Sequence, residues 1–177
     1  MDNLKEIQEN YPYSILLPQE NTYGLVFYSK FPIIRKEISH LIDPEIPSIE
    51  VDLELPSRKT ITLYGIHPTP PVPGENARST ERDAEILIVG KKAQKNPNPS
   101  IVMGDLNDVA WSYTTSLFLK ISEMADPRRG RGFYSTFHAK VPFFRWPLDH
   151  VFLSRHFGLS GLKVLRGIGS DHFPIEI

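Results

Sequence analysis

Residues 49–55 read Ile-Glu-Val-Asp-Leu-Glu-Leu, a strict alternation of apolar and acidic side chains. Successive side chains of a β-strand point to opposite faces, so this pattern predicts a half-buried strand whose three acids, Glu50, Asp52 and Glu54, face solvent. Turn-forming residues follow at 56–58, and residues 60–66 are a second run of β-forming side chains. The two runs together predict a β-hairpin.

Further strands and two helices are predicted on either side of this hairpin. Residues 75–96 have helical spacing at Ala77, Ala84, Leu87, Ile88 and Lys91, acids in the first turns and prolines just after the end. The remaining predictions are strands at 23–29, 100–103, 149–154, 162–165 and 173–177, a second helix at 111–122 and a long loop at 127–144. This order is not a regular βαβ alternation, so it indicates an α+β sheet sandwich.

Composition narrows the class of protein. The chain has 177 residues, which suits a single domain over 1–177. Its net charge is -1, so any nucleic-acid contact would need a local basic patch. It has no cysteine, which excludes disulfides, Cys-ligated zinc and a thiol nucleophile. Its longest apolar runs are far shorter than the roughly 20 residues that span a bilayer.

Polar side chains follow the predicted strand at 100–103. Asp105 and Asn107 lie two residues apart at its carboxyl end, and carboxylate and amide oxygens suit a hard cation such as magnesium or the positioning of a water. The structural alternative for an isolated Gly-Asp-x-Asn is an Asx turn.

Three other strand ends carry the same kinds of residue. His67 ends a strand and is held extended by Pro68, while Asp149 opens a strand and Asp171-His172 precedes another. If the fold brings these ends together, they provide metal carboxylates, a base for water and histidines for a leaving oxygen. That set of groups is what metal-assisted phosphoester hydrolysis requires.

Four motifs resemble those of the endonuclease/exonuclease/phosphatase superfamily, relatives of deoxyribonuclease I. They are Tyr-Gly-Ile-His-Pro at 64–68, Ile-Val-Met-Gly-Asp-Leu-Asn-Asp at 101–108, Pro-Leu-Asp-His-Val-Phe-Leu-Ser at 147–154 and Gly-Ser-Asp-His-Phe-Pro at 169–174. The resemblance extends from about Tyr11 to the C-terminus. It implies a four-layer sandwich, in which two mixed β-sheets pack face to face between outer helices.

The resemblance also implies roles for individual residues in a metal-dependent phosphodiesterase, nuclease or phosphatase. Asp105 would activate the attacking water, and Asn107 would bind the phosphate or help to hold the metal. His172 would contact the phosphate with its tautomer set by Asp149, and His67 would assist the leaving group. Asp171, with Asn107 and Asp105, would ligate Mg²⁺ or Mn²⁺. Asn21 falls where some relatives have a carboxylate that pairs with His67.

One family feature is expected upstream of this chain. The family begins with a strand carrying Asn and a strand ending in Gln-Glu, whose Glu is a principal metal ligand, so the chain is expected to be an N-terminally truncated domain. Gln19-Glu20 is a weak substitute for that motif because it lies too far downstream. The alternative hypothesis is a non-catalytic phosphate-binding or scaffold relative that lacks its main metal carboxylate.

The motifs leave the substrate open. Family substrates include nucleic acids, inositol phosphates and the phospholipid sphingomyelin, and no obligate protein partner is inferred. Residues 128–146 combine arginines with aromatics, which would form a basic aromatic loop for bases or a membrane surface; the alternative puts the arginines in solvent and the aromatics in the core. Gly-Asp-x-x-Asp at 104–108 also fits dinuclear metallophosphoesterases, but their Gly-Asn-His and Gly-His-x-His elements do not occur. The compartment is left unknown, although relatives are often bacterial and some carry N-terminal membrane helices.

Overall fold

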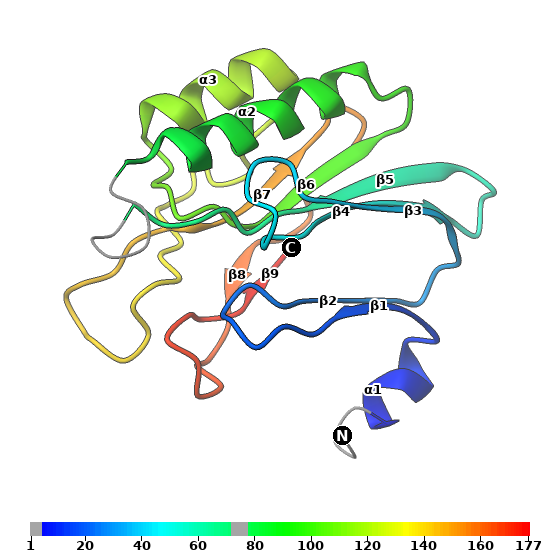
Figure 1. The fold of residues 1–177 in the computed structure, drawn as a ribbon, viewed down its shortest axis with the longest axis horizontal. Coiled ribbons are helices and arrows are strands. Elements are labelled where there is room, and N and C mark those ends of the chain that lie inside the picture. The colour runs from blue at the N-terminus through cyan, green and yellow to red at the C-terminus, as the bar shows by residue number, and fades with distance from the viewer. Residues whose placement is uncertain (1–4, 72–77) are drawn as a thin grey trace.

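A mixed five-stranded sheet lies at the centre of the fold in the computed structural model, which describes residues 5–71 and 78–177 (Figure 1). In spatial order its strands are β3 (Ile33–Ser39), β4 (Ser48–Glu54), β5 (Thr60–Gly65), β6 (Ser100–Asp105) and β7 (Asp149–Leu153). β5 and β6 are parallel, and the other neighbouring pairs are antiparallel. A parallel pair needs a crossover connection, and the chain between β5 and β6 supplies it with a helix.

Two helices, α2 (Thr80–Lys95) and α3 (Tyr113–Ser122), cover one face of this sheet (Figure 1). Ile86 and Val89 of α2 pack with Phe118 of α3 and with sheet residues in one apolar cluster. The helices approach closely at Gly90, where an added Cβ would lie 2.9 Å from the Phe118 ring. No helix in the described ranges is long and apolar enough to cross a bilayer.

Two short antiparallel pairs lie on the opposite side of the sheet (Figure 1). They are β1 (Tyr13–Leu17) with β2 (Leu25–Ser29), and β8 (Lys163–Val164) with β9 (Ile175–Glu176), while α1 (Lys5–Asn10) precedes β1. A second apolar cluster joins Ile15 of β1 to Ile49, Val51 and Leu53 of β4. The predicted α+β sandwich is therefore confirmed.

Most predicted elements are present, with shifted ends. The hairpin at 49–66 is β4 and β5, in which Val51 pairs with Leu63. The strand predicted at 23–29 begins at Leu25, and the strand at 100–103 continues to Asp105. The helix predicted from residue 75 begins at Thr80, with Ser79 as its N-cap, and the predicted residues 75–77 lie outside the described ranges. Residues 127–144, all of them described, contain neither helix nor strand, as predicted.

The residues whose spacing predicted α2 are not the ones on its buried side. The buried side of the helix consists of Glu85, Ile86, Val89, Gly90 and Ala93, whereas Ala84, Leu87 and Ile88 are only half-buried. The helix is short of strongly apolar residues, so the spacing pattern alone did not show which face meets the sheet.

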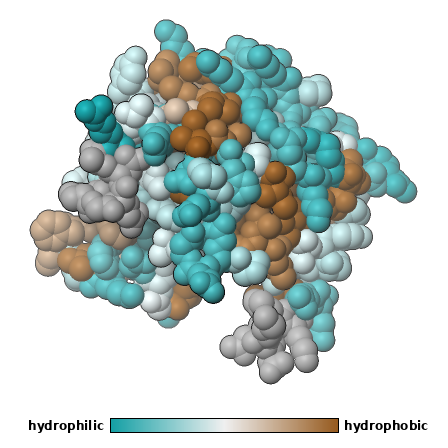
Figure 2. Space-filling view, in the orientation of Figure 1, coloured by the Kyte–Doolittle hydropathy of each residue, from teal (hydrophilic) through white to brown (hydrophobic). Residues whose placement is uncertain are grey.

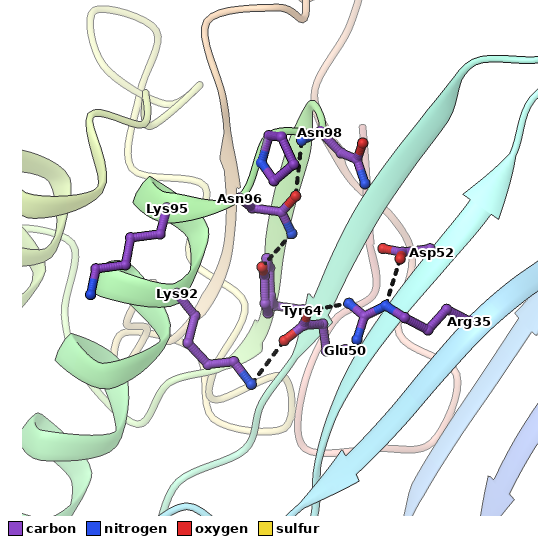
Figure 3. Close-up of a pocket in the computed structure, with 9 residues that line it drawn as sticks. Arg35, Glu50, Asp52, Tyr64, Lys92, Lys95, Asn96 and Asn98 are labelled. Carbon is purple, nitrogen blue, oxygen red and sulfur yellow. Dashed lines mark hydrogen bonds and ion pairs between the residues drawn. The ribbon is translucent and has the colours of Figure 1, made fainter.

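The prediction that the acids of β4 face solvent was also wrong for two of the three. Glu50 and Asp52 are each only 8% exposed. Arg35 Nε donates to Asp52 Oδ2 at 2.6 Å and also pairs with Glu50, while Lys92 Nζ lies 2.8 Å from Glu50 Oε2 (Figure 3). A buried charge needs a partner, and these cations supply it from β3 and α2. An alternating pattern does not distinguish a solvated face from one covered by ion pairs.

Candidate active site

An open pocket of about 440 Å³ lies at the end of the central sheet where β5 and β6 finish and β7 begins. It brings together all six residues predicted from the sequence. The pocket is lined by Thr22, Tyr23, His67, Pro70, Asp105, Asn107, Asp149, Ser170, Asp171 and His172.

Strand pairing explains why the carboxylates meet. Asp105 is the last residue of β6 and pairs in register with Asp149, the first residue of the antiparallel β7. β5 is parallel to β6, so His67, two residues beyond the end of β5, comes to the same edge. The pairing therefore places three functional groups from three strands side by side.

Gly104 allows β5 and β6 to approach at this point. Its φ is +147°, and an added Cβ would lie only 1.8 Å from the carbonyl oxygen of Ile66. Side chains rarely adopt this backbone conformation, so glycine is required immediately before Asp105.

Asp105 and Asn107 form an Asx turn and also line the pocket. The backbone N–H of Asn107 donates to Asp105 Oδ1 at 2.9 Å, and Asn107 itself has a left-handed φ of 48°. The Asn107 side-chain nitrogen donates to the carbonyl oxygen of Pro68 at 2.9 Å, which ties the loop after β6 to the loop after β5. The Asx turn and a position in the pocket, which the sequence offered as alternatives for these two residues, therefore occur together.

A chain of close polar contacts runs across the pocket. His172 Nδ1 lies 2.7 Å from Asp149 Oδ2, and its Nε2 lies 3.5 Å from Asp105 Oδ2. On the other side, His67 Nε2 lies 3.7 Å from the same Asp105 oxygen. The Asp149 contact orients the His172 ring so that Nε2 faces into the site.

These contacts set the proton affinities in the site. Burial, together with the negative charge of Asp149, raises the pKa of Asp105 above its ordinary value. Burial acts in the same direction on Asp149, but hydrogen bonds with His172 and Thr136 outweigh it and lower the pKa of Asp149. The hydrogen bond with Asp149 raises the pKa of His172. The two neighbouring carboxylates are thus driven apart in acidity, as acid and base partners often are.

Two residues that the motifs did not single out also contact the predicted residues. The Tyr23 ring packs against His67 with a centroid distance of 5.1 Å, and Asn21 accepts the Tyr23 backbone N–H at 2.9 Å. Asn21 thus acts on the loop that carries Tyr23. Thr136 is fully buried, and its hydroxyl oxygen accepts the backbone N–H of Asp149 at 3.3 Å.

A buried network behind the pocket centres on Arg128, which is 5% exposed. It donates to both carboxylate oxygens of Asp126, to the backbone oxygen of Asp149 at 3.3 Å and to His150 Nδ1 at 2.6 Å. Burial, with the nearby Arg128 charge, lowers the pKa of His150 to about 4, so this histidine is neutral and its Nε2 donates to the carbonyl oxygen of Asp108. Arg128 is therefore an internal residue, and neither sequence interpretation of the arginine loop anticipated that.

A second cation supports the loop after β6. Arg82 of α2 donates to the backbone oxygen of Asn107 at 2.6 Å and lies 3.4 Å from Asp108 Oδ1. Asp108 also accepts the hydroxyl of Thr115 at 3.0 Å. Such contacts were not readable from sequence, because their partners are far apart along the chain.

The donor set suits a divalent cation. One ligand atom each from Asp105, Asp149 and His172 lie within 4.8 Å of one another. Carboxylate oxygens are the ligands that Mg²⁺ prefers. Asp171 lines the same pocket but is exposed and lies outside this group of three. Glu20 is exposed and does not line the pocket, so the structure does not place it as a substitute ligand.

An α+β sandwich whose sheet edge joins two carboxylates, two imidazoles and an amide is typical of a class of hydrolases. Comparison with known families then gives the particular one. The chain belongs to the Endonuclease/Exonuclease/phosphatase family, whose model matches residues 2–172. It is a phosphoester hydrolase, in a family whose members generally depend on a divalent metal.

Solved structures share this fold at low sequence identity. Sphingomyelinase C from Streptomyces griseocarneus matches with a TM-score of 0.70 and 18% identity over 98% of this chain and 80% of its own. TDP2 from D. rerio, complexed with a single-strand DNA product, matches with a TM-score of 0.75 and 17% identity over 98% and 78%. The human Nocturnin catalytic domain matches with a TM-score of 0.70 and 17% identity over 99% of this chain and 74% of its own. These likenesses support the deoxyribonuclease I-like sandwich. A sequence comparison with curated proteins gave no match.

Proposed function

We propose that the chain hydrolyses a phosphodiester with a divalent metal, using the pocket formed by Asp105, Asp149, His172 and His67. The observation that carries the proposal is the line of contacts across the site. His172 is fixed by Asp149 at 2.7 Å, and both imidazoles lie within 3.7 Å of one Asp105 oxygen. A phosphate group that entered this space would meet a base and two proton donors at once.

In the proposed reaction, Asp105 takes a proton from water, the water oxygen attacks phosphorus, and the ester P–O bond breaks. The raised pKa of Asp105 supports this role, because a base works best when its proton affinity approaches the working pH. His67 lies on the side of Asp105 opposite His172, and it gives a proton to the departing oxygen. Proton transfer of this kind contributes about 10²–10⁴ in rate.

His172 is assigned to the phosphate oxygens. Its raised pKa keeps a larger share of the ring protonated, and a cationic N–H donor stabilises the charge that develops on phosphorus-bound oxygen. Asp149 acts through His172 by holding its Nδ1, and Asn107 is assigned to phosphate binding at the same edge.

Asp105 and Asp149 would offer carboxylate oxygens to the metal, and Asn107 and Asp171 line the same pocket; His172 Nε2 keeps its proton for the phosphate and is not a ligand. When bound, a divalent ion would polarise the phosphoryl oxygens and neutralise developing negative charge. Mg²⁺ is the expected ion because the ligands are mainly oxygen atoms, with Mn²⁺ as the alternative.

Single substitutions test this assignment with bis(p-nitrophenyl) phosphate as the probe in the presence of Mg²⁺. Asp105→Asn and His172→Gln should each lower kcat/KM by about 10² or more while leaving the unfolding transition cooperative. His156→Gln is the matched control, because this exposed histidine contacts Ser154 away from the pocket. Activity retained in both pocket variants would overturn the assignment.

A further inference from the structure

A protruding loop beside the pocket exposes an unusual set of side chains. Residues 140–146, here called the 140–146 tip, read Lys-Val-Pro-Phe-Phe-Arg-Trp, and all seven are exposed. Phe143 is 100% exposed and Phe144 66%. Figure 2 shows hydrophobic residues at the end of this loop, on the far left of the molecule. Aromatic side chains are usually buried, so such a concentration marks a contact surface.

The tip is held in place by backbone hydrogen bonds at its base. The N–H groups of Thr136 and Phe137 donate to the carbonyl oxygen of Trp146 at 3.1 and 3.0 Å, and that of His138 donates to Phe144 at 3.1 Å. Phe143 has a left-handed φ of 75°, a conformation that costs free energy for a residue with a side chain. The loop therefore holds the Phe143 ring outward even though that ring gains nothing from burial within the chain.

The segment that carries the tip has charged residues of one sign only. Residues 127–148 include no Asp or Glu but contain Arg128, Arg129, Arg131, Lys140 and Arg145, in a chain whose net charge is -1. Arg128 is buried against Asp126, and the other four cations are exposed. An apolar tip flanked by cations is complementary to a bilayer surface with anionic headgroups.

A second exposed loop next to the tip adds aliphatic side chains. Arg145 lies over the Phe173 ring at 5.0 Å, and Phe173 ends the loop that carries Leu165, 41% exposed, and Ile168, 78% exposed. Val141 of the tip is also exposed. Aliphatic side chains have no face on which a base can stack, whereas a bilayer accepts aliphatic and aromatic side chains alike. This mixture favours a lipid surface over nucleic acid.

The tip is joined directly to the candidate active site. The Ala139 N–H donates to the backbone oxygen of Asp171 at 2.6 Å, and the Phe173 N–H donates to Thr136 at 2.8 Å. The Phe137 ring packs on His172 with a centroid distance of 4.9 Å. A surface that engages the tip would thus lie close to the pocket.

We propose that the 140–146 tip docks the protein on the surface of a phospholipid bilayer, with Phe143 and Phe144 entering the interface and Lys140 and Arg145 meeting anionic headgroups. Docking would place the pocket near headgroup phosphodiesters; that consequence for the substrate rests on the proposed function, whereas docking itself does not.

Vesicle sedimentation of the 177-residue chain tests the proposal without metal or turnover, so its outcome is independent of the proposed hydrolysis. The probes are phosphatidylcholine vesicles with and without phosphatidylserine. The chain should partition onto the anionic vesicles, and the double variant Phe143→Ala/Phe144→Ala should bind at least tenfold more weakly with an unchanged melting temperature. Ile34→Ala, which removes an exposed apolar side chain from β3, should bind like the parent chain.

Several results would overturn docking. One is a parent chain that stays in solution with both vesicles; another is a double variant that binds as tightly as the parent. Loss of single-stranded DNA binding in the double variant, without vesicle binding by the parent, would assign the tip to nucleic acid instead. Dissociation of a dimer by the same variant would assign it to a second copy. Hydrolysis of bis(p-nitrophenyl) phosphate should be unchanged, and an equal loss there would assign the tip to the chemistry of the site.

Discussion

At the scale of single residues, the contact between His172 and Asp149 is the part of the site with the clearest electrostatic consequence. The pKa of His172 is higher in the folded chain than in the unfolded chain, so protonated His172 stabilises the fold. This stabilisation is complete below about pH 6.5 and is lost as pH rises through the pKa of the folded chain. The lowered pKa of Asp149 makes its contribution present above about pH 3.9 and lost as pH falls through the folded value. The pair therefore stabilises the fold most between about pH 4 and 6.5.

Replacing the carboxylate should change the titration of its partner. Asp149→Asn is expected to lower the pKa of His172, because the hydrogen bond with Asp149 is the largest cause of its elevation. Histidine NMR titration of the metal-free protein measures this directly. Asp171→Asn is the matched control and should change the His172 pKa less, because Asp171 exerts only a weaker charge effect. An unchanged pKa in Asp149→Asn would show that the contact does not form in solution.

Glu85 is a buried acid outside the site. It lies on the buried face of α2 and is 3% exposed, and its Oε1 has no hydrogen-bond partner among the described residues. Burial, with the charge of Asp43, raises the pKa of Glu85 to about 7. The folded chain therefore holds this proton more tightly than the unfolded chain, and stability is lost as pH rises from about 4.5 to about 7.

Glu85→Gln replaces the buried carboxyl group with a neutral amide, so the variant does not lose stability through ionisation of residue 85 as pH rises. We expect the variant to be more stable than the parent by on the order of 2 kcal/mol at about pH 8, and by much less at about pH 5. Urea unfolding at the two pH values measures the difference. Glu81→Gln, a change at an exposed position on the same helix, is the matched control. A pH-independent difference for Glu85→Gln would contradict a raised pKa.

The six site residues predicted from the sequence all line the candidate pocket, because each stands close to one end of a predicted strand. The sequence did not predict Thr136, Arg128 or Arg82, which act through backbone atoms of residues distant in the chain. The prediction that Glu50 and Asp52 face solvent failed for a similar reason. Their partners, Arg35 and Lys92, come from other elements, and local alternation carries no information about them.

At the scale of elements, the junction of β5 and β6 is the most constrained point. Gly104→Ala would place a Cβ 1.8 Å from the Ile66 carbonyl oxygen in a backbone conformation that disfavours side chains. We expect a loss of about 3 kcal/mol or more in unfolding free energy, together with loss of activity, because Asp105 follows directly. Urea unfolding measures the first and phosphodiester hydrolysis the second.

Gly130→Ala is the control for that substitution. Gly130 also has a positive φ, of 75°, but an added Cβ there would meet nothing within 4 Å. Gly130→Ala should lower the unfolding free energy only by the cost of placing alanine in this backbone conformation, about 1 kcal/mol. Equal losses in the two variants would contradict a steric role for Gly104.

Element boundaries were predictable where prolines end a pattern, as at the C-terminal end of α2, and where alternation was strict, as in β4. β1 and β3 were not predicted. β3 reads Ile-Ile-Arg-Lys-Glu-Ile-Ser, and its charged centre belongs to the ion pairs with β4 rather than to a solvated loop. Such a strand is recognisable only when its neighbour is known.

At the scale of the whole molecule, the sandwich brings separate strand ends to one place. β5, β6 and β7 deliver His67, Asp105 and Asp149 to a single sheet edge, and the segment before β9 adds His172 from the other layer. Two apolar clusters, one on each face of the central sheet, hold this arrangement. The sequence predicted the sandwich class, but the packing of the β1–β2 pair against the sheet required the structure.

The pocket is proposed to hydrolyse a phosphodiester with the help of a divalent metal. The most direct test is the rate of bis(p-nitrophenyl) phosphate hydrolysis by the 177-residue chain as Mg²⁺ is titrated in and then removed with a chelator, in parallel with Asp105→Asn. We predict activity that rises with Mg²⁺, disappears on chelation and falls by about 10² or more in the variant. A folded chain with no Mg²⁺-dependent hydrolysis, or a variant as active as the parent, would contradict the claim.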